Sequence, residues 1–213
     1  MYRLMLLVVS AAIAATTSMA QVIRNSDNLP PSDSSYVGQF HARYASGLVQ
    51  LSNPIHDMFT NSSPPPGPGG TTTHSFGSRV SADVSISGGT PARLTANADC
   101  TVIVRWLDQI GNLRIFDTEM IQLDISGGDL PAGVMIRESP TLPSTGRTTI
   151  EDIGGGMYRI DSFFDIFTEL TLSGGQSWFP TESGAGRVTL VPEPASLSAL
   201  ALGLIALARR RRR

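Results

Sequence analysis

The 213-residue chain contains no lysine, so its positive charge comes from 16 arginines alone. Six of these arginines lie in the terminal segments. The other ten face 18 carboxylates, which leaves the body of the chain with a charge of about −8. An acidic body repels phosphate backbones, so the sequence predicts that no nucleic acid is a partner. The length indicates one domain with appendages at its two ends.

Cysteine is nearly absent as well, and the single Cys100 excludes a disulfide within the chain. Cys100 begins an apolar alternation that continues with Val102, Val104 and Trp106, which predicts a thiol buried under one face of a strand. The alternative is a catalytic thiol, which requires a histidine near it in space.

Motifs for catalysis or cofactor binding are also missing from the sequence. The three histidines, His41, His56 and His74, do not have the spacing of zinc ligands. The chain has no Gly-x-Ser-x-Gly elbow and no phosphate-binding loop between a strand and a helix. We therefore predict no catalytic residues, no metal and no cofactor, and a protein that is not an enzyme.

The first 20 residues have the pattern of a signal peptide. Arg3 supplies a positive start, and residues 4–15 form a short apolar run. Ser18 and Ala20 place small residues where signal peptidase reads the chain, so we expect cleavage before Gln21. The alternative is a retained membrane anchor, but the run is short for a membrane span.

The chain ends in three ordered parts. Val191, Pro192, Glu193 and Pro194 come first, and the two prolines predict an extended, exposed backbone. An apolar run over residues 195–208 follows, which as a helix is about 21 Å long and so shorter than a bilayer core of about 30 Å.

Positive charge completes this terminus. The last five residues are Arg209, Arg210, Arg211, Arg212 and Arg213, which keep this end in the cytoplasm and the body outside. They therefore act as a cytoplasmic stop, and they exclude a terminal helix buried in the core.

The order of these parts over the last 23 residues resembles the PEP-CTERM sorting signal of Gram-negative and related bacteria. The resemblance implies that an exosortase, a membrane protease of the transpeptidase kind, is a partner beside signal peptidase. It also implies export through the inner membrane, transient anchoring by a C-terminal hydrophobic helix, and delivery to the cell surface or extracellular matrix.

The body between the two signals has the pattern of β-strands. Val80, Ala82, Val84 and Ile86 alternate with polar residues, and similar short alternations recur between turns rich in glycine. The sequence therefore predicts an all-β fold, a single antiparallel β-sandwich over residues 76–190. Residues 21–75 are expected to be extended and poor in strands, with a loop of proline and glycine.

Three alternating segments end in Ser-Gly-Gly, beginning at Val84, Leu123 and Leu170, and each predicts a tight turn. The third continues as TLSGGQSW, which resembles the Asp-box hairpin of sialidase-type propellers, with Ser173 in place of the aspartate. That resemblance implies a hairpin with Trp178 packed on its turn. The wider segment 134–178 resembles uncharacterised secreted PEP-CTERM proteins of planctomycete-like bacteria.

One further pattern concerns carboxylates. Asp161, Asp165 and Glu169 alternate with phenylalanines on one predicted strand face. They could line a glycan-binding or hydrolytic groove, hold calcium, or form a solvated face. We expect an exported structural or adhesive protein, with extracellular polysaccharide as a possible partner. The alternative is a secreted glycan-active hydrolase or carbohydrate-binding module that uses these three residues.

Overall fold

The computed structural model describes residues 21–182 and 184–193, and the regular elements of this part of the chain are β-strands apart from one short helix. The elements are β1 (Val22–Arg24), β2 (Ser34–Gly38), β3 (His41–Tyr44), the short helix η1 (Ala45–Gly47), β4 (Val49–Asp57), β5 (Thr71–Ile86), β6 (Ala92–Ile110), β7 (Leu113–Ser126), β8 (Val134–Glu138), β9 (Ser144–Gly154), β10 (Met157–Ile166), β11 (Thr168–Leu172), β12 (Ser177–Trp178) and β13 (Gly186–Pro192). The predicted all-β class is therefore confirmed.

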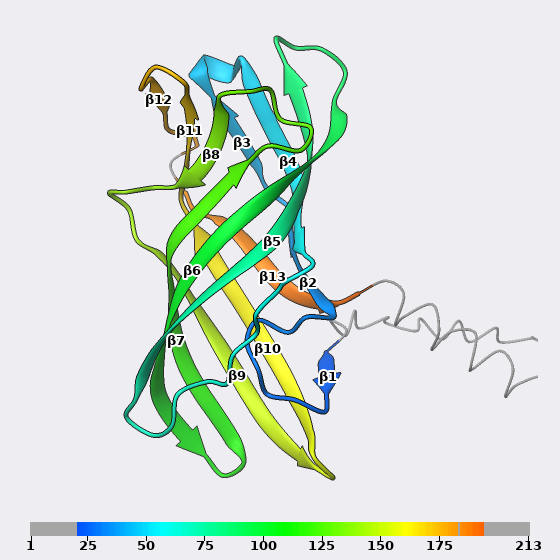
Figure 1. The fold of residues 1–213 in the computed structure, drawn as a ribbon, viewed down its shortest axis with the longest axis vertical. Coiled ribbons are helices and arrows are strands. Elements are labelled where there is room, and N and C mark those ends of the chain that lie inside the picture. The colour runs from blue at the N-terminus through cyan, green and yellow to red at the C-terminus, as the bar shows by residue number, and fades with distance from the viewer. Residues whose placement is uncertain (1–20, 183, 194–213) are drawn as a thin grey trace, which may run out of the picture.

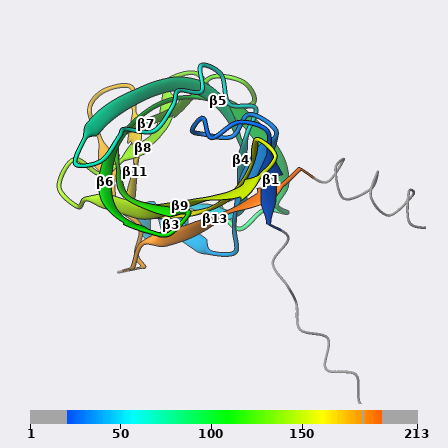
Figure 2. The same cartoon turned by 90° about the horizontal axis from the view of Figure 1, so that it is seen from below.

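Eight of the strands form a closed antiparallel barrel. Around the ring, β10 pairs with β13, which pairs with β2, and the order continues through β4, β5, β6, β7 and β9 back to β10. Figure 2 shows this ring in the view from below. The structure thus has one closed sheet where the sequence predicted a sandwich of two.

Side chains alternate between the inner and the outer face along the strands of a sandwich and of a barrel alike, so this pattern does not distinguish the two architectures. Closure depends on which edges pair, and Phe163 of β10 lies opposite Arg147 on one side and Thr189 on the other. Irregularities in register between Thr101 and Val102 and between Trp106 and Asp108 let the 19-residue strand β6 bend around the ring.

Further strands extend the sheet at one end of the barrel, the upper end in Figure 1. After Met120, β7 leaves its partner β9, and from Asp124 onward it pairs with β8. On this side β11 pairs with β8, and β12 pairs with β11. On the other side β3 pairs with β4. The short β1 adds to β10 elsewhere, opposite Tyr158 to Ile160.

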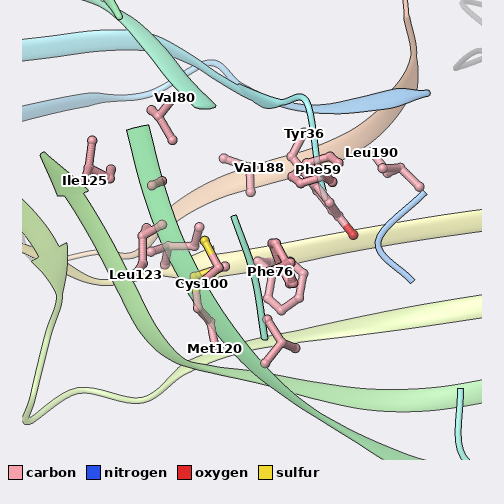
Figure 3. Close-up of a cluster of buried hydrophobic side chains, with 14 of the residues drawn as sticks. Tyr36, Phe59, Phe76, Val80, Cys100, Met120, Leu123, Ile125, Val188 and Leu190 are labelled. Atoms are coloured by element: carbon pink, nitrogen blue, oxygen red, sulfur yellow. The ribbon is translucent and has the colours of Figure 1, made fainter. Parts of the chain in front are cut away.

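Side chains fill the middle of the barrel. On β10, Ile160, Ser162, Phe164 and Ile166 point inward in strict alternation. The rings of Tyr36 and Phe59 and of Tyr36 and Phe164 meet edge to face, with centroids 5.8 and 5.5 Å apart. Figure 3 shows Tyr36, Phe59 and Phe76 close together in this core. A space of only about 30 Å³ remains between the side chains, as in small barrels with packed interiors.

A chain of hydrogen bonds joins three barrel strands inside this core. The hydroxyl of Tyr36 donates to Oγ of Ser162 at 2.9 Å, and the hydroxyls of Ser162 and Thr148 lie 2.8 Å apart. All three residues are buried. Because a buried hydroxyl without a partner costs free energy, these bonds let β2, β9 and β10 carry polar groups inward.

Residues 21–75 contain more strand than the sequence indicates. They hold β1 to β4 and the beginning of β5, and β2 and β4 belong to the barrel ring. The proline- and glycine-rich stretch 61–70 lies between β4 and β5. Two backbone hydrogen bonds between Leu29 and Ser63, of 2.8 and 2.9 Å, tie this loop down.

Candidate functional site

The three candidate carboxylates do not share a groove. Asp161 and Asp165 lie on the outer face of β10, whereas the strand breaks at Phe167 before Glu169. Glu169 is 2% exposed and forms an ion pair with Arg137 of the neighbouring strand β8. Five cavities formed by the described residues have other linings, and Asp161, Asp165 and Glu169 border none of the five.

Asp165 is bound on both oxygens by one arginine. Nε and Nη2 of Arg187 donate to its two carboxylate oxygens at 2.8 and 2.6 Å, and this bond holds the pKa of Asp165 below its usual range. The same guanidinium lies over the ring of Phe163, 4.2 Å from its centroid. Asp161 differs, because partial burial raises the pKa of its carboxyl. The arrangement fits a solvated strand face with lateral ion pairs.

The structure does place a histidine beside the single cysteine. Nε2 of His56 lies 3.7 Å from Sγ of Cys100 and 2.6 Å from Oγ of Ser78, whose hydroxyl donates to the carbonyl of Ala98. Cys100 is 2% exposed and His56 is 6% exposed. The cluster therefore lies inside the barrel wall, away from solvent.

Burial keeps both groups of this cluster neutral. It raises the pKa of Cys100 to about 12 and lowers the pKa of His56 to about 4. A nucleophilic cysteine requires a thiolate, which a neighbouring cation or a helix N-terminus normally stabilises. Cys100 has the opposite environment, so its predicted role as a buried apolar residue is the one that the geometry supports. The described residues also contain no group of three or more His, Cys, Asp or Glu that could hold a metal ion.

The start of the proline-containing terminal motif is part of the barrel. In the pairing of β13 with β2, Val191 lies opposite Ser35 and Pro192 lies opposite Ser34. Pro192 is the last residue of its strand, a position where the missing N–H costs little. Glu193 follows directly, and Pro194 lies outside the described residues.

Charged groups of β4 and β5 lie near this exit. Arg79 donates to both oxygens of Asp57 at 3.0 and 3.1 Å. This bond raises the pKa of the Arg79 guanidinium, and the negative charge of Glu193 raises it further. The carboxylate of Glu193 therefore lies within electrostatic reach of an arginine on the barrel wall.

Residues 190–213 match the PEP-CTERM protein-sorting motif. The resemblance of the C-terminus to this signal is thus confirmed. A PEP-CTERM motif implies export, transient anchoring in the membrane, processing by an exosortase, which is a membrane protease, and sorting to the cell surface. No curated protein and no solved structure matches the chain.

Several predicted residues of the PEP-CTERM motif and of the signal peptide lie outside the part of the chain that the structure describes. These are Ser18, Ala20, Pro194, the hydrophobic segment 195–208 and the arginines 209–213. In residues 21–182 and 184–193, no helix has the length and apolar character needed to cross a membrane.

The hairpin predicted at TLSGGQSW is present, since Leu170 of β11 lies opposite Trp178 of β12. The indole does not pack on the turn as expected. A Cβ placed on Gly174 or Gly175 would meet no atom within 4 Å, and Trp178 instead lines an apolar cavity. The likeness to an Asp box stays a prediction. Sequence reasoning missed this cavity, although the recurring Ser-Gly-Gly turns around it were the available signal.

Proposed function

We propose that this protein is a structural or adhesive component of the cell surface or extracellular matrix, and that its barrel contacts extracellular polysaccharide without catalytic turnover. One observation carries the proposal. The strand that closes the barrel, β13, runs without a linker into the PEP-CTERM motif at Val191 and Pro192. The object that the sorting pathway delivers is therefore the barrel itself.

The outer surface supports a contact role. Arginines and carboxylates of neighbouring strands form ion pairs across the sheet, as with Arg105 and Glu119 at 2.8 Å and Arg147 and Asp117 at 2.9 Å. Such exposed pairs add little stability individually. They do present a hydrated surface of paired charges, of the kind that suits contact with a polar polymer.

The absence of turnover is part of the same proposal. It is supported by the neutral, buried pair of His56 and Cys100. It is also supported by Asp165 and Glu169, each of which forms an ion pair with an arginine. A group that acts as nucleophile or general base needs access to substrate and a suitable protonation state. His56, Cys100 and Glu169 are buried and lack that access, and both oxygens of Asp165 are held by Arg187.

The test uses protein released from cells that carry out the sorting, together with polysaccharide purified from the same cells. We expect the protein to sediment with the polymer, and we expect no rise in reducing ends after prolonged incubation. Sedimentation equal to that of an unrelated acidic protein would contradict the adhesive role. Accumulation of reducing ends would contradict the claim that the protein is not an enzyme.

A further inference from the structure

Four Ser-Gly turns lie at one end of the barrel. They are Ser46-Gly47, Ser87-Gly88, Ser126-Gly127 and Ser173-Gly174, and we call this region the Ser-Gly end. Backbone hydrogen bonds of 2.7 Å connect its turns, from Ser87 N–H to the carbonyl of Leu48 and from Ser173 N–H to the carbonyl of Gly133. It is the upper end in Figure 1.

The Ser-Gly end surrounds an open cavity of about 120 Å³. Its fourteen lining residues, all within the described part of the chain, are apolar. They include Trp178, Leu170 and Val134 from the added strands β12, β11 and β8. At the rim, Leu48 and Ile86 are 52% and 51% exposed. Apolar side chains thus form both the walls and the entrance.

The cavity continues toward the middle of the barrel. A second space of about 20 Å³ lies next to it, and the two share the residues Leu51, Val84, Leu94, Leu130 and Ile136. Every shared residue is aliphatic. The apolar surface therefore extends inward from the Ser-Gly end, and a bound molecule would enter along this path.

The charged groups near the cavity already have partners. Oδ2 of Asp129 accepts from the backbone N–H of Thr95 at 2.9 Å. Arg93 donates to the carbonyl of Asn53 at 2.8 Å and to Asp83 at 3.3 Å. An ionic ligand would lose its hydration on entry and find no opposite charge in the lining, so the site selects against charge.

Water is also a poor occupant, because it needs two to four polar partners and the lining offers apolar side chains. A cavity of about 150 Å³ with similar walls can bind benzene, so a space of about 120 Å³ accommodates a molecule of about that size. Binding would cover Leu48 and Ile86 at the rim, which gains the free energy of burying apolar surface.

We propose that the Ser-Gly end binds one small, uncharged, hydrocarbon-like molecule in this cavity. The ligand class is set by the apolar lining, the size of the space and the pairing of the nearby charges. Nothing in this proposal depends on the contact with polysaccharide, so it adds a binding activity to the surface role.

The experiment uses protein released from cells, with Trp106 changed to Phe so that Trp178 is the one tryptophan. Trp178 lines the cavity, so its fluorescence reports occupation directly. Hexanol and hexanoate serve as probes of equal chain length at pH 7. We expect saturable quenching by hexanol and at least tenfold weaker binding of hexanoate, whose ionised carboxylate has no partner in the lining.

Two variants separate the cavity from the rest of the surface. Val134→Phe adds volume inside the cavity and should reduce hexanol affinity at least tenfold. Ile110→Phe adds the same side chain at an exposed position at the far end of the 19-residue strand β6. It should leave the hexanol affinity unchanged. If Val134→Phe does not fold, Val49→Phe replaces it, since Val49 also lines the cavity.

Four results would overturn the proposal. The first is a lack of saturable binding, and the second is equal affinity for hexanol and hexanoate. The third is a doubled molecular mass by light scattering that returns to that of a monomer in Val134→Phe, because a second copy would then cover the cavity. Hexanol binding that Val134→Phe and Ile110→Phe reduce equally would likewise remove the assignment to this site.

Discussion

Pro192, the second residue of the Val-Pro-Glu-Pro motif at 191–194, lies opposite Ser34 in the barrel sheet. The sorting signal therefore begins inside the folded domain, and Glu193 is the first residue beyond the strand. An exosortase that reads this motif meets a backbone whose leading part is already fixed in an extended conformation.

Replacing both Pro192 and Pro194 by Ala should block processing, because the two rings restrict the backbone to the extended form that a protease can read. We expect the variant to stay at full length in the membrane fraction, while wild type is released. Cell fractionation with an antibody to the barrel makes the measurement. The control is Pro91→Ala, an exposed proline between β5 and β6, which should be released like wild type.

The ion pair of Arg137 and Glu169 should matter for stability far more than a surface pair. Glu169 has a side chain that is 3% exposed, so Arg137→Ala leaves a buried charge without its partner and should cost about 3 kcal/mol. Arg147→Ala is the matched control, because Arg147 and Asp117 are 51% and 44% exposed, and it should cost less than about 1 kcal/mol. Urea denaturation gives both values, and equal losses would contradict the prediction.

Folding stability should fall in mild acid because of His56. Burial lowers its pKa in the folded state to about 4, below the ordinary value of 6.5. The unfolded chain therefore binds a proton first, and the stabilising contribution, complete above pH 6.5, is lost as the pH falls toward 4. At about 1.4 kcal/mol per pKa unit, the loss between pH 7.5 and pH 4.5 is about 2–3 kcal/mol.

The variant His56→Gln tests this assignment by urea denaturation at both pH values. The pH-dependent loss should shrink by that amount in the variant. Burial also lowers the pKa of His74, so some acid sensitivity should remain in both proteins. His41→Gln, at an exposed position, should behave like wild type. An unchanged pH dependence in His56→Gln would show that other groups cause the loss.

Cys100 should be inert in the native protein. Its thiol is buried and its pKa is raised to about 12, so very little thiolate exists at pH 8. Iodoacetamide should label it at least a hundredfold more slowly in buffer than in guanidinium. The variant Ser87→Cys, with a thiol on an exposed turn, should be labelled at once. Rapid labelling of wild type would show that the cluster with His56 is accessible.

The strands that the sequence predicted best are those with apolar residues on every second position. Val80, Ala82 and Val84 are buried in alternation, as their pattern indicates. Strand β9 was not predicted, because Ile150 is the only large apolar residue on its inner face and Ser144 and Thr148 occupy the other buried positions. Such a polar inner face is explained by hydrogen bonds to neighbouring strands, as between Thr148 and Ser162 of β10.

The rest of the site depends on contacts between distant parts of the chain. The period of two in the sequence placed Glu169 on one strand face with Asp161 and Asp165. Glu169 is buried because it lies opposite Arg137 of β8, a residue distant in sequence, and forms an ion pair with it. Likewise, the hydroxyls of Tyr36 and Ser162 meet across 126 residues. The sorting motif was readable because its three parts are continuous in sequence.

The place of β13 in the ring also sets an order of events during export. A chain that crosses the membrane from its N-terminus brings β2 out early, and β2 must wait for β13 before the ring can close. The closing strand appears together with the motif that addresses the protein to the surface. A chain cut short before Gly186 would therefore lose its address and its closed fold at the same time. Complete synthesis is in this way a condition for display.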